Sequence, residues 1–351
     1  MPKTQNRAIM IWLFIFAFTV ASLVLWGGFT RLTRSGLSIV EWNPINGAIP
    51  PFGEHAWQAE FNKYQQTPEY LQVNHGMSLE QYKFIFYIEW FHRLLARSAG
   101  MIYALPVFYF LFTRRIPWRE FGIYFAMGML FILQAFAGWY MVASGLVDRP
   151  SVSHYLLTVH LFLALSLFGL SLWTAFGHRY GFPARAKFSL PSKLAVAAFV
   201  VLLIQIAYGG FTAGLKAGYV SDTWPLMFGR LLPPNLFSSP GNILEVPQTV
   251  VFFHRWFAWT GFLAVPAVYW AAKKRSYPAG IVRGLTWLAG FVALQITLGI
   301  LTVISHVSIP IALMHQANAI ILFALGIYFI HRLRARDAGQ PGSAEAIVPQ
   351  P

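Results

Sequence analysis

The first long apolar run of the chain ends with the tetrapeptide GGFT at residues 27–30, and the same tetrapeptide recurs at residues 209–212, near the end of another apolar run. The same offset of 182 residues relates Trp42 to Trp224. Glycine recurs by chance in membrane helices, because small residues allow helices to pack closely. Here the shared residues keep one order and one register, so the sequence predicts an internal duplication.

Further matched segments follow in the same order in both halves. They are FHR at 91–93 and 253–255, Gln134 and Gln295, and Gly138 and Gly299. His160 and His315 then fall early in the last apolar run of each half. We therefore expect an N-terminal half over residues 1–190 and a C-terminal half over 191–335. Residues 336–351 are rich in Gly, Pro, Ser and Ala and are expected to form a disordered cytoplasmic tail.

The composition indicates a membrane protein. Hydrophobic residues make up 57% of the 351 residues and charged residues only 11%, whereas soluble domains have about 25% charged residues. The chain contains no cysteine, which excludes disulfides, iron–sulfur clusters, thiolate zinc sites and thiolate-ligated haem. Any metal must therefore be held by His, Met, Tyr or carboxylate side chains.

Eight apolar runs are long enough to span a bilayer, and backbone groups in lipid must find hydrogen bonds within their own segment. The runs cover residues 8–28, 84–112, 121–143, 155–176, 193–213, 249–272, 284–305 and 308–331. The predicted fold is an all-α integral membrane protein with eight transmembrane helices. Four helices per half return the chain to the side it entered, so the two four-helix bundles are expected to be related by a pseudo-twofold axis along the membrane normal.

The distribution of charge predicts the orientation. Lys and Arg outnumber the acids in the N-terminus, in three short connections and in the tail, while the two long loops on the other side carry balanced charge. By the positive-inside rule, both termini of this multi-pass protein are cytoplasmic. The net charge of +14 then reflects topology, and no nucleic-acid partner is expected.

Four of the ten histidines are candidates for ligands. His92, His160, His254 and His315 each lie several residues inside the outer end of a predicted span, in one layer at a depth of about 9–14 Å. For a single buried imidazole, a helix–helix hydrogen bond would be an equally good explanation. Two per half, on the second and fourth helices, favour axial ligation of haem iron from facing helices. The other six histidines, in loops or near helix ends, are expected to be interfacial or solvated, with contact to a haem edge or propionate as the alternative for any one of them.

Arginines lie next to two of these histidines. Arg93 and Arg255 directly follow His92 and His254, and Arg97 is one turn beyond Arg93. A buried guanidinium needs an anionic partner, and haem propionates directed towards the outer face would provide one. The alternative is that these side chains extend to the outer membrane interface.

One carboxylate breaks the symmetry of the two halves. Glu89 lies three residues before His92 on the same helix face, while the second half has Val251 at the corresponding position. An intramembrane carboxylate beside a haem ligand suggests proton or substrate-radical chemistry. The alternative is a structural salt bridge with Arg93 or Arg97. We expect the N-terminal half to be reactive and the C-terminal half to hold a haem for electron transfer or structure.

These motifs resemble the haem A synthase family (COX15/CtaA). The resemblance extends over about residues 8–331 and rests on the first helix and its outer loop, on Pro68-Glu69-Tyr70, on residues 89–93 and 134–138, on His160 and His254, and on residues 314–318. The family's outer-loop cysteine pairs are absent here, which is typical of its alphaproteobacterial and mitochondrial-like branch.

The resemblance implies an enzyme that converts the C8 methyl of haem O to a formyl group through successive hydroxylations, giving haem A for terminal oxidases. It further implies that His254 and His315 ligate a resident haem B. His92 and His160 would belong to the substrate site, with Glu89 as the essential carboxylate. Expected partners are haem O, membrane lipid, haem O synthase, oxidase assembly factors, an unidentified electron donor and a second copy of the chain.

The short N-terminus has no transit peptide, which favours a bacterial inner membrane. Two other functions remain compatible with the composition. A haem transporter or chaperone would need a passage that continues to the inner face. A cytochrome b-like quinol electron carrier would place two haems at different depths and would have no use for Glu89.

Overall fold

The computed structural model describes residues 5–338 except 44–45, 148–149, 185 and 237, and all its regular secondary structure is helical. The long helices are α1 (Arg7–Leu32), α4 (Leu79–Phe112), α5 (Phe121–Ala143), α6 (His154–Tyr180), α7 (Leu190–Gly214), α9 (Pro247–Lys274), α10 (Ala279–Ile304) and α11 (Ile309–Asp337). The short helices are α2 (Glu54–Tyr64), α3 (Pro68–Gln72) and α8 (Asn242–Glu245), together with the 3₁₀ turns Asn46–Ala48, Trp118–Glu120 and Ala217–Tyr219.

Within the described part of the chain, seven helices are long and apolar enough to cross a membrane: α1, α4, α5 with the turn before it, α6, α7, α10 and α11. The chain is therefore a multi-pass membrane protein, as its composition predicted. Helix α9 has 28 residues but does not reach the same hydropathy. It contains His254 and Arg255, and its last turn contains Lys273 and Lys274. These polar residues lower its mean hydropathy.

Local sequence explains where several helices start. Asn6 caps α1 by accepting hydrogen bonds from two backbone amides of the first turn. Ser78 and Gln81 form a reciprocal capping box at the start of α4. Ser189 caps α7, which has Pro191 in its first turn, where a missing amide hydrogen costs nothing. These caps set the helix starts on which the positions of the site residues depend.

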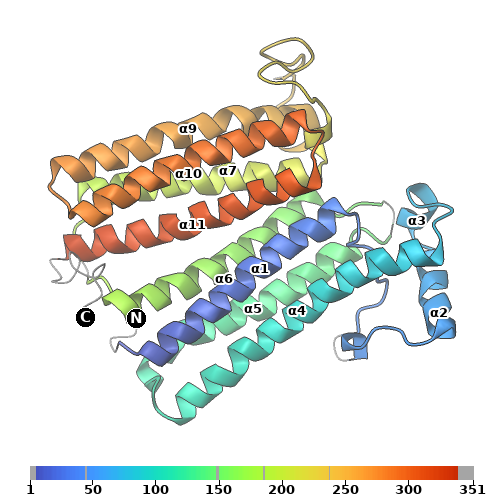
Figure 1. Cartoon of the computed structure of the whole chain (residues 1–351), viewed down its shortest axis with the longest axis horizontal. Helices are drawn as coiled ribbons and strands as arrows, with labels where there is room; N and C mark the ends of the chain where they lie inside the picture. Colours follow the sequence, from blue (N-terminus) through green and yellow to red (C-terminus); the bar gives the residue numbers. More distant parts are fainter. Residues whose placement is uncertain (1–4, 44–45, 148–149, 185, 237, 339–351) are drawn as a thin grey trace.

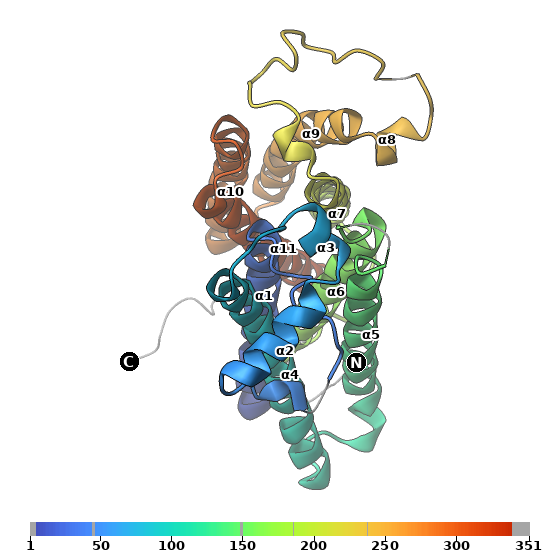
Figure 2. The ribbon, with the colours of Figure 1, turned by 90° about the vertical axis from the view of Figure 1, so that its right-hand side faces the viewer.

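The long helices run side by side, with α1 and α4–α6 in the lower part of Figure 1 and α7 and α9–α11 in the upper part. Helices α1, α6, α7 and α11 make the contacts between these two groups. The start of α1 and the end of α11 lie at one end of the molecule. The long connections that contain α2, α3 and α8 lie at the other end, which we call the outer end (Figure 2).

Buried aromatic side chains join α2 to the outer end of α4. Trp57, Phe61 and Tyr64 of α2 pack against Tyr82 and Phe86 of α4. The ring centroids of Tyr64 and Tyr82 are 5.1 Å apart. This cluster fixes the first outer connection against the helix that carries Glu89 and His92.

The recurrent GGFT motif has a packing reason in both halves. A Cβ on Gly28 of α1 would overlap the Gln316 side chain of α11, whose amide donates to the carbonyl oxygen of Val24 at 2.7 Å. In the same way, a Cβ on Gly210 of α7 would lie 2.6 Å from the hydroxyl oxygen of Thr158 of α6. The second glycine of each motif thus lets the fourth long helix of the other half approach.

One arginine also connects the halves. Arg31 Nη1 donates to the carbonyl oxygen of Ala213 at 2.6 Å, and the two residues are 182 positions apart. Ala213 is therefore the counterpart of Arg31 in the second half.

Helix α11 runs through Asp337, so the first two residues of the expected tail are helical, and residues 339–351 lie outside the described residues. The Asp337 side chain is 2% exposed. Its carboxylate accepts hydrogen bonds from Ser189 N at 3.2 Å, Tyr277 Oη at 3.1 Å and Arg334 Nη1 at 3.1 Å. This carboxylate joins the end of α11 to the start of α7 and to the turn before α10.

We predict that Asp337→Ala lowers the free energy of unfolding by about 1–3 kcal/mol, because three donors lose a buried acceptor. Denaturant titration in detergent micelles measures the change. Asp222→Ala is the control: its side chain is 53% exposed and faces His306, so its effect should stay within about 0.5 kcal/mol. Equal effects of the two substitutions would contradict this role of Asp337.

Candidate functional site

All eight long helices line one cavity of about 910 Å³. Its walls are mostly apolar, as in small-molecule and cofactor sites. The cavity brings together every site residue predicted from the sequence: Glu89, His92, Arg93, Arg97, His160, His254, Arg255 and His315.

Each of the four histidines lies against a glycine of the neighbouring helix. A Cβ on the glycine would lie 2.7–3.4 Å from the imidazole. The pairs are Gly27 with His92, Gly138 with His160, Gly209 with His254, and Gly299 with His315. Gly27 corresponds to Gly209, and Gly138 corresponds to Gly299. Both halves therefore use a glycine at the same position to make room for an imidazole between two helices.

The imidazoles on α9 and α11 are held by polar side chains. Gln205 Nε2 lies 3.1 Å from His254 Nδ1 and donates to the His254 carbonyl oxygen at 2.9 Å. His315 Nδ1 lies 3.1 Å from the carbonyl oxygen of Gln295. Asn318 Nδ2 donates to Gln295 Oε1 at 2.7 Å. Such contacts fix the ring orientation and the tautomer of a histidine. The nitrogen of His315 with the lone pair is then Nε2, which lies 3.3 Å from Gln295 Nε2.

The rings of His254 and His315 have a separation suited to one metal between them. Their centroids are 6.3 Å apart, and their planes are inclined by 84°. Two metal–nitrogen bonds of about 2 Å each, plus the ring radii, give about this separation. The apolar walls, the two imidazoles and the lack of cysteine together fit a haem with two histidine ligands.

The imidazoles on α4 and α6 contact the backbone of Leu23 and Gln134, as their counterparts contact Gln205 and Gln295, but they have fewer polar side chains around them. Gln134 Nε2 lies 3.3 Å from His160 Nε2. Leu23 stands at the position that corresponds to Gln205, and Leu163 at the position that corresponds to Asn318. The second half therefore orients its histidine pair with more hydrogen bonds than the first half does.

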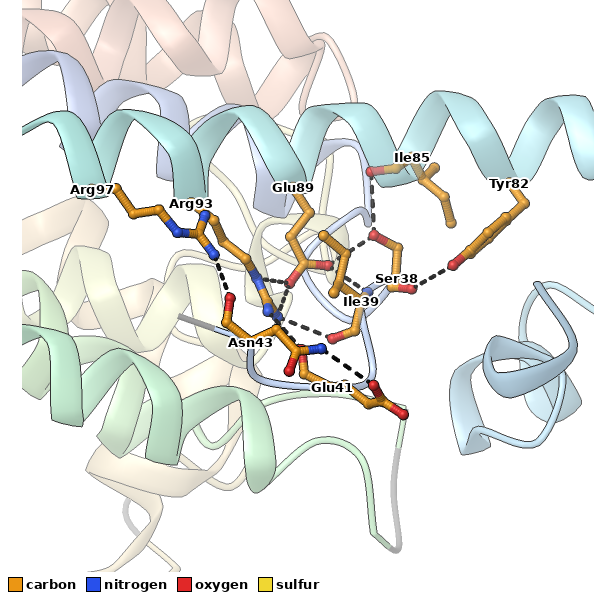
Figure 3. A network of polar contacts seen from close by, with 9 residues as sticks. All are labelled: Ser38, Ile39, Glu41, Asn43, Tyr82, Ile85, Glu89, Arg93 and Arg97. Atoms are coloured by element: carbon orange, nitrogen blue, oxygen red, sulfur yellow. Dashed lines mark hydrogen bonds and ion pairs between the residues drawn. The ribbon is translucent and has the colours of Figure 1, made fainter. Parts of the chain in front are cut away.

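Glu89 holds the segment that follows α1 (Figure 3). Its carboxylate is buried and accepts hydrogen bonds from Ser38 Oγ at 2.8 Å and from the backbone amide of Ile39 at 2.9 Å. It also pairs with Arg93, at 2.7 Å from Nη2 and 3.1 Å from Nε. The salt bridge to Arg93, considered above as an alternative, is present, and the carboxylate also faces the cavity.

Arg93 and Arg255 hold corresponding backbone segments. Arg93 donates to the carbonyl oxygens of Ile39 at 3.0 Å and Glu41 at 3.1 Å. Arg255 donates to those of Ser221 at 2.6 Å and Thr223 at 3.0 Å, which are the counterparts of Ile39 and Glu41 at the offset of 182.

Arg97 Nη2 donates to the carbonyl oxygen of Asn43 at 2.8 Å, so it also fastens the segment after α1. All three arginines are among the residues that line the cavity, and their guanidinium groups hold the outer connections.

Two of the histidines assigned to interfaces are in fact buried. His178 lies within α6 and forms a 2.8 Å hydrogen bond with Tyr124 Oη. His331 is fully buried, with its ring centroid 4.9 Å from that of Trp173. The expectation was wrong because α6 continues past its apolar run to include His178, and because both imidazoles contact aromatic side chains of other long helices.

Sequence reasoning also missed Gln205 and Asn318, although each is a polar residue inside an apolar run beside a candidate ligand. It assigned no role to Glu69 of the Pro68-Glu69-Tyr70 motif, whose side chain lines the cavity.

We predict that Glu89→Ala releases the segment after α1. The backbone amide of Ile39 loses a charged acceptor, so hydrogen exchange of a peptide covering residues 35–43 should accelerate by about tenfold or more. Mass spectrometry of deuterium uptake measures the rate. Glu41→Ala is the control, since that side chain is half exposed and pairs with Lys63. Unchanged exchange in the Glu89 variant would show that other contacts hold the segment.

Residues 10–327 match the COX15-CtaA family, described as "Cytochrome oxidase assembly protein". Among similar proteins named "Heme A synthase", that of Wolbachia sp. subsp. Brugia malayi (strain TRS) is 40% identical over 96% of this chain and 100% of its own length. That of Parvibaculum lavamentivorans is 41% identical over 94% of this chain and 95% of its own. That of Mesorhizobium japonicum is 45% identical over 91% of this chain and 88% of its own. With this coverage and identity, the chain belongs to the COX15-CtaA family of cytochrome oxidase assembly proteins.

Proposed function

We propose that this protein is a haem A synthase, a membrane enzyme that oxidises the C8 methyl of haem O to a formyl group through successive hydroxylations. The observation that carries the proposal is one apolar cavity lined by four histidines, each against a glycine, with the buried Glu89 three residues before His92 and Val251 at the corresponding position of the second half. The similar proteins named "Heme A synthase" support the same function. The product supplies haem-copper terminal oxidases.

The proposed architecture has eight transmembrane helices, with α9 as the eighth. Helix α9 is as long as the other spans and packs against α7 and α10. The helices would form two four-helix bundles, α1 with α4–α6 and α7 with α9–α11, related by a pseudo-twofold axis. The corresponding contacts of Arg93 and Arg255 support this relation. With basic residues concentrated at the inner end, both termini are cytoplasmic in a bacterial inner membrane.

The two halves have different tasks in this proposal. The C-terminal half, residues 191–335, holds a resident haem B through His254 and His315. When bound, this haem supplies one-electron transfer. The N-terminal half, residues 1–190, binds haem O beside His92 and His160. Gln205 and Asn318, which have only leucine counterparts, support a permanently oriented ligand pair in the second half.

The residues of the first half bind the substrate and move protons. Glu89 accepts or relays a proton as the methyl group is oxidised, while Ser38 and Arg93 fix the direction of its carboxylate. The apolar walls exclude water, which strengthens charge interactions within the cavity. Arg93, Arg97 and Arg255 hold the outer connections and present positive charge to the propionates of the bound porphyrins.

The proposed partners follow from this reaction. Haem O arrives from haem O synthase, haem A leaves to oxidase assembly factors, and electrons enter from a separate donor. A second copy of the chain is a further proposed partner.

A haem transporter is the second candidate. The cavity is also lined by Ala195 and Phe329, near the inner ends of α7 and α11, and a continuing passage would suit transport. A transporter has no use for a buried carboxylate in one half, and for this reason we favour the enzyme.

Extraction and chromatography of haems from cells with and without the protein test the proposed function. We expect cells without it to lack haem A and to accumulate haem O. Wild-type protein should restore haem A, whereas a folded, haem-loaded Glu89→Gln protein should not. Unchanged haem content on deletion would refute the enzyme, and full restoration by Glu89→Gln would refute the role of its carboxylate.

The contact between Gly299 and the His315 imidazole gives a second test. A valine at position 299 would push the imidazole out of place, since even a Cβ there lies 3.1 Å from it. We predict at least about tenfold weaker retention of the resident haem in Gly299→Val, in the range that misplacing a ligand produces. The bis-histidine absorbance of the purified protein measures retention. Gly290→Val on the same helix is the control, because a Cβ there meets no atom within 4 Å.

A further inference from the structure

A second carboxylate in the first half is also directed towards the cavity. Glu69 belongs to α3, a helix of five residues in the first outer connection. Its side chain is buried and lines the cavity, while Leu71 and Gln72 of the same turn are exposed. The short helix α3 thus has Glu69 on the cavity and two neighbouring residues exposed at the outer end.

Hydrogen bonds and charged side chains surround this carboxyl group. Tyr64 Oη of α2 donates to Glu69 Oε2 at 3.3 Å, and Asn74 Nδ2 donates to Tyr64 Oη at 2.7 Å. Three charged groups face it from other elements: Lys216 after α7, Arg34 after α1 and Glu89 of α4.

Opposing influences keep this carboxyl group titratable near neutral pH. Burial, followed by the charge of Glu89, raises the pKa of Glu69 to about 7. The hydrogen bond from Tyr64 and the charges of Lys216 and Arg34 lower it, so the rise is the net result. A group that transfers protons works best when its pKa lies near the working pH. Glu89 instead accepts hydrogen bonds from Ser38, Ile39 and Arg93.

We propose that Glu69 carries protons between the reaction cavity and the water at the outer end during methyl oxidation. The inference rests on the proposed function, since replacing C–H bonds by C–O bonds requires protons to cross the cavity wall. The O–H bond of the carboxyl group breaks towards one side and re-forms with a proton from the other. Glu69 is thereby regenerated, and it transfers no electrons.

The test is the rate of haem A formation from haem O by the purified, haem-loaded protein, measured from about pH 5.5 to about pH 8.5 around the neutral range. Glutamine has the size of glutamate, and its oxygen can still accept from Tyr64, but it does not titrate. We expect Glu69→Gln to lower kcat by about tenfold or more and to remove an inflection near pH 7 that the wild type shows. Glu60→Gln of α2, which breaks a surface pair with Lys63, is the control and should keep the wild-type profile.

Lys216→Met gives an independent measurement if Glu69→Gln does not fold. Lys216 lowers the pKa of Glu69, so its removal raises that pKa, and the inflection should move to higher pH. A purely structural role of Glu69 would leave the inflection in place.

The outcomes separate the two proposals. If the wild type forms haem A and Glu69→Gln keeps either the rate or the inflection, the role of Glu69 is refuted. An inflection that does not move in Lys216→Met refutes it as well. If the wild type itself forms no haem A, the proposed function fails.

Discussion

The structure depends on the fit between an imidazole and a glycine on the next helix. Two helices that approach closely in a membrane leave no space for a ring unless one of them lacks a side chain at the contact. At four places a glycine provides that space, and the imidazole then faces the cavity instead of lipid. Helix spacing, cavity walls and ligand direction all follow from these contacts.

On this shared scaffold, the two halves differ in the polar groups that surround the histidines. The second half has Gln205 and Asn318 around its pair, and it has Val251 packed in an apolar cluster at the position of Glu89. The first half has leucine at the first two positions and a carboxylate at the third. Polar side chains around a histidine fix its ring orientation, and this support differs between the two pairs.

Much of this could be predicted from the sequence. The helical fold and the family followed from apolar runs and ordered motifs, which are local signals, and the four histidines singled out in the sequence all line the cavity. Burial of His178 and His331 did not follow, because it depends on aromatic side chains from distant helices. The hydrogen bonds from Arg93 to the carbonyl oxygens of Ile39 and Glu41 could not be predicted either. No pattern within α4 specifies how the preceding connection folds over this helix.

The hydrogen bond from Arg31 to Ala213 joins a residue to its own counterpart. In a symmetric dimer of identical halves, each such contact occurs twice, and every residue is present in both copies. Such a dimer would have two copies of Glu89 or none. Covalent linkage of the halves removes this restriction, so one arginine can remain while its counterpart becomes alanine. The same freedom allows Glu89 in the first half and Val251 at the corresponding position of the second half.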